Sequence, residues 1–336
     1  MTINYFTETH PASRDKLTIM VMAQVRKEFG AEVEPFFLHK PIPELLAGSW
    51  MACRETLISG IANREAKEVV AAVISRMNRC PYCVDAHTVM ALGASGRDYT
   101  GAIASGRYET ISDPFMRSIA EWASATLSPD SPVLRYPPFN PDEAPEYIGT
   151  ALFFNYINRM ATILLGASPL PFTDGIMKGI AMRLAAFFFS SAIHRTKQPG
   201  TSLDLLQKEP LSNDLAWAAP SPFVSGALAR FSAAIEKAAK TILTENTASL
   251  VIDQLDRWDG GDPGISSSWC DHLLFRCNDP EKTVARLALH TAIAPWQISK
   301  EMVRAFSSYH PGDKALLSIL SWSSLSAARR ISQWLA

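Results

Sequence analysis

A short stretch in the first third of the chain places two cysteines and a histidine at helical spacing directly after a turn. Residues 78–96 read NRCPYCVDAHTVMALGASG, with Cys80, Cys83 and His87 separated by three and four residues. Proline is tolerated in the first turn of a helix, where its missing N–H would have no partner, so Pro81 predicts a helix that begins there with Cys80 as N-cap. Side chains three and four residues apart share one helix face, so we expect Cys83 to lie beside both Cys80 and His87.

Two thiols and an imidazole at the start of a helix are suited to redox chemistry. The free N–H groups and the dipole of the first turn favour thiolate over thiol, and a neighbouring imidazole is a proton acceptor. One thiolate of such a pair can attack the O–O bond of a peroxide and become a sulfenic acid, which the other thiol resolves as a disulfide. Helix-end electrostatics alone favours Cys80 as the nucleophile, since it is the more N-terminal and, we expect, the more exposed thiol.

The first half of the chain repeats helical patterns and shows no alternating strand. Apolar residues recur at helical spacing over 13–29, 44–60, 63–77, 98–105, 114–127 and 143–165. Gly30, Gly106 and a proline-rich loop separate these segments. The first 165 residues therefore predict an all-α bundle. A CxxC of the thioredoxin type needs a βαβ setting, so that class is not expected.

Composition argues against several classes of protein. The 32 Lys and Arg residues nearly balance 33 Asp and Glu, and no basic run is interleaved with aromatics, so we expect no nucleic-acid partner. The N-terminus lacks the basic and apolar regions of a signal peptide, and prolines and charges interrupt the most apolar stretch, 160–193. We therefore expect no membrane span and a cytoplasmic location. Five cysteines in 336 residues do not make a disulfide framework.

Weak internal similarity predicts that the fold is duplicated. Residues 113–130 resemble 279–296, and FFNYINRMATILL has an echo in LSAARRISQWL near the C-terminus, at offsets of about 166 and 171 residues. The predicted units are a helical domain with the site over 1–165, a connector with a helical piece over 166–225, and a degenerate second helical repeat over 226–336. The cysteine segment maps onto 245–253, which has no cysteine or histidine, so the second repeat would lack the site.

A carboxylate within reach of the imidazole would orient it and accept its proton, as the third group of a catalytic triad does. Glu68 is the candidate, because it lies twelve residues before Cys80 on the preceding predicted helix. Glu65 and Asp85 are also near in sequence, and distance along the chain does not choose among the three.

These residues resemble a known family. Glu68, eleven further residues and then CPYCVDAH match the E-x11-C-x2-C-x3-H pattern of the alkyl hydroperoxidase D branch of the carboxymuconolactone decarboxylase superfamily. The resemblance covers roughly residues 10–165 and includes FFNYINR, which is similar to the FN-x2-NR helix of peroxidase-related members. It implies that Glu68 and His87 relay a proton from Cys83, the nucleophile, and that Cys80 is its disulfide partner. At Tyr82 the chain departs from alkyl hydroperoxidase D, which often has a histidine there.

The resemblance also implies a fold and an activity. The fold would be the alkyl hydroperoxidase D-like helical bundle, here in two repeats. The activity would be that of a thiol-dependent peroxidase or disulfide oxidoreductase acting on hydrogen peroxide or an alkyl hydroperoxide. Its reductant would be a dithiol such as a lipoyl or thioredoxin-like protein, and we expect no cofactor and no resident metal. Family members assemble as homo-oligomers, so the same is expected here.

Two other interpretations remain open. The first is a decarboxylase or lyase of the same superfamily that uses His87 and Glu68 as acid and base, although the lactone decarboxylases lack the cysteine pair. The second is a non-catalytic helical interaction module whose thiols either sense redox state or hold zinc, in the latter case with Cys53, Cys270 or His272 as the fourth ligand.

The remaining cysteines and histidines have simpler explanations. Free cysteines are commonly small buried hydrophobes, which is the default for Cys53, Cys270 and Cys277. His194, His272 and His290 lie in helical or helix-flanking segments without a thiol or carboxylate constellation, so we expect them to be ordinary core or surface histidines.

Overall fold

The computed structural model describes all residues except 1–2, 7–14, 31, 166–174 and 196. The described residues form helices and no strand, which confirms the prediction of an all-α fold. The α-helices are α1 Lys16–Phe29, α2 Glu34–Phe37, α3 Pro43–Cys53, α4 Arg64–Met77, α5 Pro81–Ser95, α6 Thr100–Ser105, α7 Pro114–Ala125, α8 Ala144–Leu164, α9 Gly175–His194, α10 Pro222–Ala239, α11 Glu245–Arg257, α12 Asp279–Ile293, α13 Lys300–Ser307 and α14 Asp313–Trp334. The short turns are the π-helix η1 Arg54–Ile58 and the 3-10 helices η2 Tyr108–Thr110, η3 Pro132–Arg135, η4 Leu203–Leu205, η5 Asn213–Ala218, η6 Asp271–Leu273 and η7 Pro295–Gln297. The expected helix start at 13 and the head of the connector, 166–174, lie outside the described residues.

Local signals explain where the helices around the motif begin and end. The side chain of Asn63 accepts a hydrogen bond from the N–H of Ala66, so α4 starts directly after it. Gly96 ends α5 with a φ of 76°, a left-handed conformation that glycine adopts without steric cost. The helical stretch predicted over 44–60 is observed as α3, which changes at Arg54 into a π-helical turn that ends at Ile58. That turn carries Glu55, which is buried and accepts a hydrogen bond from the backbone N–H of Gly200 after α9.

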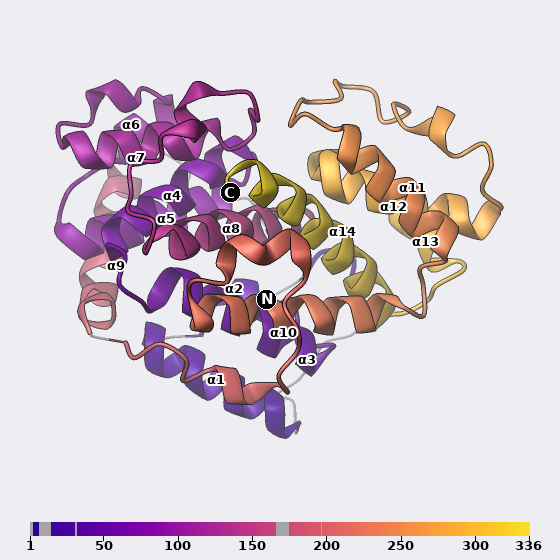
Figure 1. Ribbon diagram of the computed structural model, residues 1–336, viewed down its shortest axis with the longest axis horizontal. Coiled ribbons are helices and arrows are strands. Elements are labelled where there is room, and N and C mark those ends of the chain that lie inside the picture. Colours follow the sequence, from indigo (N-terminus) through magenta and orange to yellow (C-terminus); the bar gives the residue numbers. More distant parts are fainter. Residues whose placement is uncertain (1–2, 7–14, 31, 166–174, 196) are drawn as a thin grey trace.

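Helix α8 lies at the centre of the fold, between α4 and α14 (Figure 1). Two of its asparagines hold the turn that leads into α5: Asn155 accepts a hydrogen bond from Asn78 at 3.0 Å, and Asn158 accepts one from Ser75 at 3.1 Å. Arg159 is buried and donates to a backbone carbonyl of α12 at 2.8 Å, and this burial lowers its pKa to about 9. The FN-x2-NR segment therefore joins the cysteine turn to the second half of the chain.

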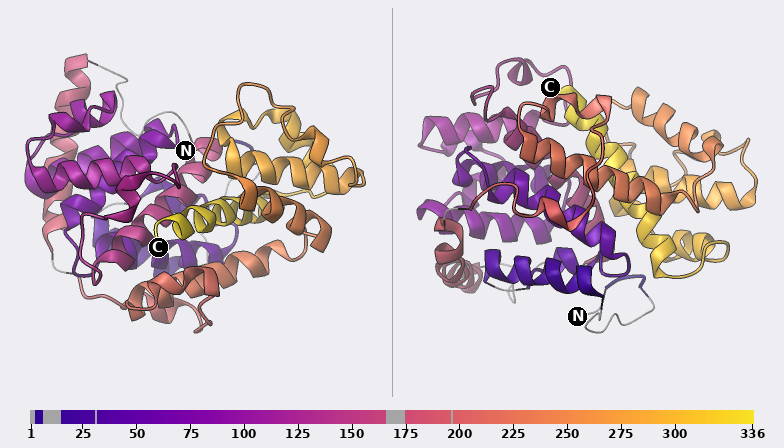
Figure 2. Two further views of the ribbon diagram at one scale, coloured as in Figure 1. Left: turned by 45° about the horizontal axis from the view of Figure 1, so that its top comes forward. Right: turned by 60° about the horizontal axis from the view of Figure 1, so that its bottom comes forward.

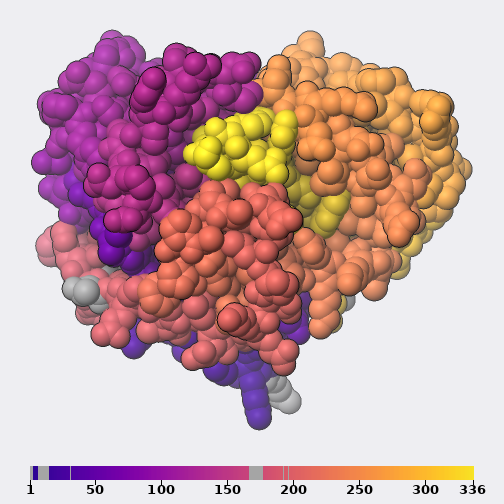
Figure 3. Space-filling model, viewed as in Figure 1, coloured from indigo at the N-terminus to yellow at the C-terminus, as the bar shows by residue number. Residues whose placement is uncertain are grey.

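The second half packs on the first mainly through α10 and α14. In both views of Figure 2, α14 lies between the first half and the helices α11, α12 and α13, which are coloured orange. Figure 3 shows the end of α14, in yellow, at the surface between these two parts. Helix α12 falls near the position that α7 and the offset of 166 residues predict, and α14 near the one that α8 predicts. The two-repeat arrangement stays a prediction. The predicted connector contains α9, a 20-residue helix that packs on α5. Over the ranges that the structure describes, no helix combines the length and apolar character needed to cross a bilayer.

A buried ion pair fixes the turn before α4. The Nζ atom of Lys67 lies 2.6 Å from Oε2 of Glu146, and the two residues are 1% and 5% exposed. Glu146 also accepts hydrogen bonds from the N–H groups of Ile61 and Ala62, at 2.7 and 3.1 Å. A side chain at Gly60, whose φ is 102°, would collide with the same carboxylate. The pair thus positions the helix that carries the candidate carboxylate of the site.

Glu146→Ala is expected to lower the free energy of unfolding by about 3–5 kcal/mol, because it leaves the Lys67 ammonium buried without its partner. Denaturant unfolding followed by circular dichroism measures this loss. Glu44→Ala, which removes an exposed carboxylate from the first turn of α3, is the control and should cost less than about 1 kcal/mol. Equal losses in the two variants would contradict the prediction.

Candidate active site

The two thiols of the motif lie side by side at the start of α5. Cys80 is the N-cap residue and Pro81 occupies the first turn, as the sequence predicts. The Sγ atoms of Cys80 and Cys83 are 2.9 Å apart. The N–H of Cys80 donates to the carbonyl oxygen of Ser75 at 2.9 Å, which closes the turn between α4 and α5.

The residue before this pair is held by the second half of the chain. Arg79 has a φ of 55°, a left-handed conformation that costs free energy for a residue other than glycine. Its guanidinium lies 2.5 Å from the carboxylate of Asp262 and 4.3 Å from the centroid of the Trp296 ring. The second half thus contacts the turn before α5 directly, through a side chain that is 56% exposed.

Of the three candidate carboxylates, Glu68 is the one in contact with the imidazole. Its Oε2 lies 2.7 Å from Nδ1 of His87, and its other oxygen accepts from Nε of Arg64 at 2.8 Å. Glu65, one turn earlier, accepts instead from Tyr99. Asp85 forms an ion pair on the α9 side of α5.

The surroundings of Glu68 keep it charged. Complete burial by itself would raise the pKa of this carboxyl, but the neighbouring Arg64 and His87 outweigh burial and hold the pKa below its usual value. An ionised carboxylate only accepts hydrogen bonds, so Nδ1 of His87 carries the proton that lies between them. In the neutral ring, Nε2 is then free to accept a proton from another group.

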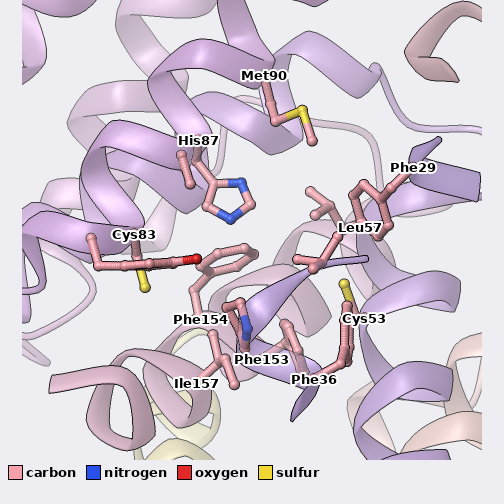
Figure 4. A pocket seen from close by; sticks show the side chains of 14 residues that line it. Phe29, Phe36, Cys53, Leu57, Cys83, His87, Met90, Phe153, Phe154 and Ile157 are labelled. Carbon is pink, nitrogen blue, oxygen red and sulfur yellow. The ribbon is translucent and has the colours of Figure 1, made fainter. Parts of the chain in front are cut away.

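A pocket opens beside Cys83 and His87 (Figure 4). Its volume is about 80 Å³, and all 14 lining residues except Cys53, Tyr82, Cys83 and His87 have apolar side chains. Cys83 and Cys53 lie on opposite sides of the pocket, and the rings of His87 and Phe154 pack in a T-shaped arrangement, with the ring centroids 4.4 Å apart. The pocket therefore presents the thiols of Cys83 and Cys53, the imidazole of His87 and the side chain of Tyr82 to an otherwise apolar space.

Charge and access favour different sulfurs of the pair. Cys80 and Cys83 are 1% and 3% exposed, so the prediction that Cys80 is the more exposed thiol was wrong, because α8 covers the N-cap. The hydrogen bond between the two sulfurs lowers the pKa of Cys80. Burial raises the pKa of Cys83. Of these two thiols, Cys83 lines the pocket and Cys80 does not, so Cys83 is the sulfur of the pair that a molecule in the pocket would meet.

Two contacts next to this site were not predicted from the sequence. Arg64 precedes Glu68 by four residues on one helix, and that spacing was a usable signal for the contact. Tyr82 donates a hydrogen bond from its hydroxyl to Oε2 of Glu34 at 2.6 Å, across 48 residues of sequence. Burial raises the pKa of Tyr82 and the Glu34 carboxylate raises it further, so the hydroxyl stays a donor. No pattern in the sequence linked Tyr82 to Glu34.

The other thiols do not complete a metal site. Among the described residues, no group of three or more His, Cys, Asp and Glu side chains is arranged to hold a metal ion. Cys270 instead lies 3.8 Å from Nδ1 of His290, a contact that the sequence did not predict. Both ring nitrogens of His290 contact backbone carbonyl oxygens, those of Arg286 and Ser267, in a fully buried position.

Two comparisons with known proteins concern the family to which the chain belongs. Residues 44–98, which contain Glu68 and the whole cysteine motif, match the carboxymuconolactone decarboxylase family. The chain is also 34% identical over 333 residues to a Mycobacterium tuberculosis protein named alkyl hydroperoxide reductase Rv2159c, covering 99% of this chain and 95% of that relative. With the motif, the all-α fold and this full-length similarity together, the chain belongs to the carboxymuconolactone decarboxylase family, on its alkyl hydroperoxidase D-like branch.

Proposed function

We propose that the protein is a thiol-dependent peroxidase that reduces hydroperoxides and cycles through a disulfide between Cys80 and Cys83. The observation that carries the proposal is one connected set of groups. Two sulfurs lie 2.9 Å apart, one of them faces a pocket beside His87, and His87 lies 2.7 Å from the buried carboxylate of Glu68. The name of the relative and the family match support a peroxidase-related function.

In the first step, Cys83 is the nucleophile. Nε2 of His87 takes the proton of the Cys83 thiol, and the carboxylate of Glu68 stabilises the imidazolium that results. The thiolate attacks the terminal oxygen of the hydroperoxide, so that an S–O bond forms and the O–O bond breaks. The proton on His87 passes to the departing alkoxide and gives the alcohol, or water when the substrate is hydrogen peroxide. Cys83 is left as a sulfenic acid.

In the second step, Cys80 resolves the sulfenic acid. Its sulfur attacks the sulfur of Cys83, the S–S bond forms, and hydroxide leaves and takes the proton of Cys80 to become water. The sulfurs have to approach from 2.9 Å to the bonding distance of about 2.05 Å. An external dithiol, such as a lipoyl or thioredoxin-like protein, then reduces the disulfide by exchange and is itself oxidised. Each cycle converts one hydroperoxide and one dithiol into an alcohol, a water molecule and a disulfide.

Mass spectrometry tests this cycle directly. One equivalent of cumene hydroperoxide added to the reduced protein is expected to remove two hydrogen atoms from the peptide that holds Cys80 and Cys83. Cys53 is expected to stay reduced, because burial raises the pKa of its thiol and keeps it protonated. Excess dihydrolipoamide should restore the original mass. A protein whose mass does not change after treatment with the hydroperoxide would rule the proposal out.

A further inference from the structure

The lining of the pocket points to the chemical class of the substrate, on the basis of the proposed peroxidase function. Hydrogen peroxide is small and polar, and it needs no apolar wall. The space in front of Cys83 is nevertheless enclosed by side chains such as Phe29, Phe36, Leu57 and Ile157, and no charged residue lines it. Burial of apolar surface is the main source of affinity in such a pocket. The lining therefore fits a hydroperoxide that carries a hydrocarbon group.

The pocket as it stands is too small for such a group. Its volume is about 80 Å³. An apolar protein cavity that binds benzene has a volume of about 150 Å³. Several water-sized molecules fit into the observed space, but a ring or a branched alkyl group does not. A substrate of this class therefore requires one wall of the pocket to move.

The burial of the lining residues shows where the pocket opens. Leu57, Phe153 and Phe154 are at most 2% exposed and form its inner end. The half-buried lining residues belong to two segments, Val33 and Pro35 at α2 and Ala86 and His87 on α5. The mouth of the pocket consequently lies between α2 and α5.

The hydrogen bond from Tyr82 to Glu34 crosses this mouth. Tyr82 lines the pocket from the first turn of α5, and Glu34 is the first residue of α2. Among the described residues it is the one side-chain hydrogen bond that joins these two helices. Loss of this bond would release the α2 side of the mouth from α5.

The rim formed by residues 33–35 is the wall best suited to move. Helix α2 has four residues, and its N-cap makes no side-chain hydrogen bond. Phe36 anchors its inner end by packing on Trp50, with the ring centroids 5.4 Å apart. The opposite walls belong to α5 and α8, which are long helices packed into the core.

We infer that Tyr82 and Glu34 form a gate that determines which hydroperoxides reach Cys83. With the hydrogen bond formed, the rim lies against α5 and the pocket admits only small molecules. With the bond broken, the rim separates from α5, the hydrocarbon group of an organic hydroperoxide enters the pocket, and its O–O bond reaches the sulfur of Cys83. Both residues act by positioning the wall and take no part in the chemistry.

The gate is tested by removing the hydrogen bond from either side. Tyr82→Phe and Glu34→Ala are each expected to raise, by about tenfold, the ratio of kcat/KM for cumene hydroperoxide to kcat/KM for hydrogen peroxide. The double variant should match the single ones, because both substitutions break the same bond. A second measurement needs no turnover: alkylation of Cys83 by N-benzylmaleimide, relative to iodoacetamide, should accelerate by a similar factor.

Tyr99→Phe is the matched control, because it also removes a hydrogen bond from a buried tyrosine to a carboxylate, that of Glu65, but away from the pocket. It should leave both ratios unchanged. The gate is refuted if Tyr82→Phe and Glu34→Ala leave both ratios at the wild-type value. If the wild type reduces no hydroperoxide but the two variants still show faster alkylation by the bulky reagent, the proposed function fails and the gate stands.

Discussion

Cys83→Ser is expected to reduce dithiol-dependent consumption of hydroperoxide by at least about 1000-fold, to the level of buffer and reductant alone. A serine hydroxyl has a far higher pKa than a thiol and a weakly nucleophilic oxygen, so neither His87 nor the helix start makes it reactive toward an O–O bond. Removing the nucleophile of a covalent mechanism abolishes the pathway and does not merely slow one of its steps. Steady-state assays with cumene hydroperoxide and dihydrolipoamide measure the effect.

Cys80→Ser separates the roles of the two sulfurs. Without a resolving thiol, the protein should consume one equivalent of hydroperoxide as Cys83 becomes a sulfenic acid, and turnover should then stop. Rapid mixing under single-turnover conditions detects this burst, and trapping with dimedone locates the sulfenic acid. Cys277→Ser, a buried cysteine of the second half, is the control with wild-type turnover expected. A burst in Cys83→Ser and none in Cys80→Ser would assign the roles the other way round.

The start of α5 was predictable from sequence because its signals are local. Pro81 fixes the first turn, and spacings of three and four residues set which side chains are neighbours whatever the rest of the fold does. The choice of Glu68 over Glu65 and Asp85 was not local. It depended on how α4 packs against α5. The sequence pattern of the family singled out Glu68, whereas no local physical signal did.

The prediction that failed at the site concerned burial. An N-cap residue is usually near the surface, but here α8 covers Cys80, and this covering depends on contacts between segments about 80 residues apart. The same limit applies to the bond between Tyr82 and Glu34 and to the contact of Arg79 with Asp262. Each pairs single polar residues across long stretches of chain, and no periodic pattern in the sequence marks such pairs.

Glu68→Gln is expected to lower kcat/KM for hydroperoxide about 100-fold to 1000-fold at neutral pH. Glutamine is close in shape, but it carries no charge to stabilise the imidazolium of His87, and its amide can present an N–H to Nδ1 and favour the wrong tautomer. The deficit should shrink as the pH rises, because the fraction of Cys83 that ionises without the help of a base grows with pH, even though burial raises the pKa of this thiol. Pseudo-first-order rates of sulfenic acid formation from pH 6 to pH 9, an interval of about three units, measure both effects.

Two controls separate this relay from a structural role of the carboxylate. Glu65→Gln changes another buried carboxylate on the same helix, which contacts Tyr99 and not His87, so its rates should stay within about threefold of the wild type.

The pH dependence is the second control. Because the pKa of Glu68 is held below its usual value, the carboxylate stabilises the fold above its unfolded pKa of about 4.5, and that stability is lost as pH falls through the lower folded value. From pH 6 to pH 9 it is therefore ionised throughout. If the deficit of Glu68→Gln were the same at every pH in that interval, Glu68 would act by holding the helices in place, and thiol activation would have to come from the helix start and Cys80 alone.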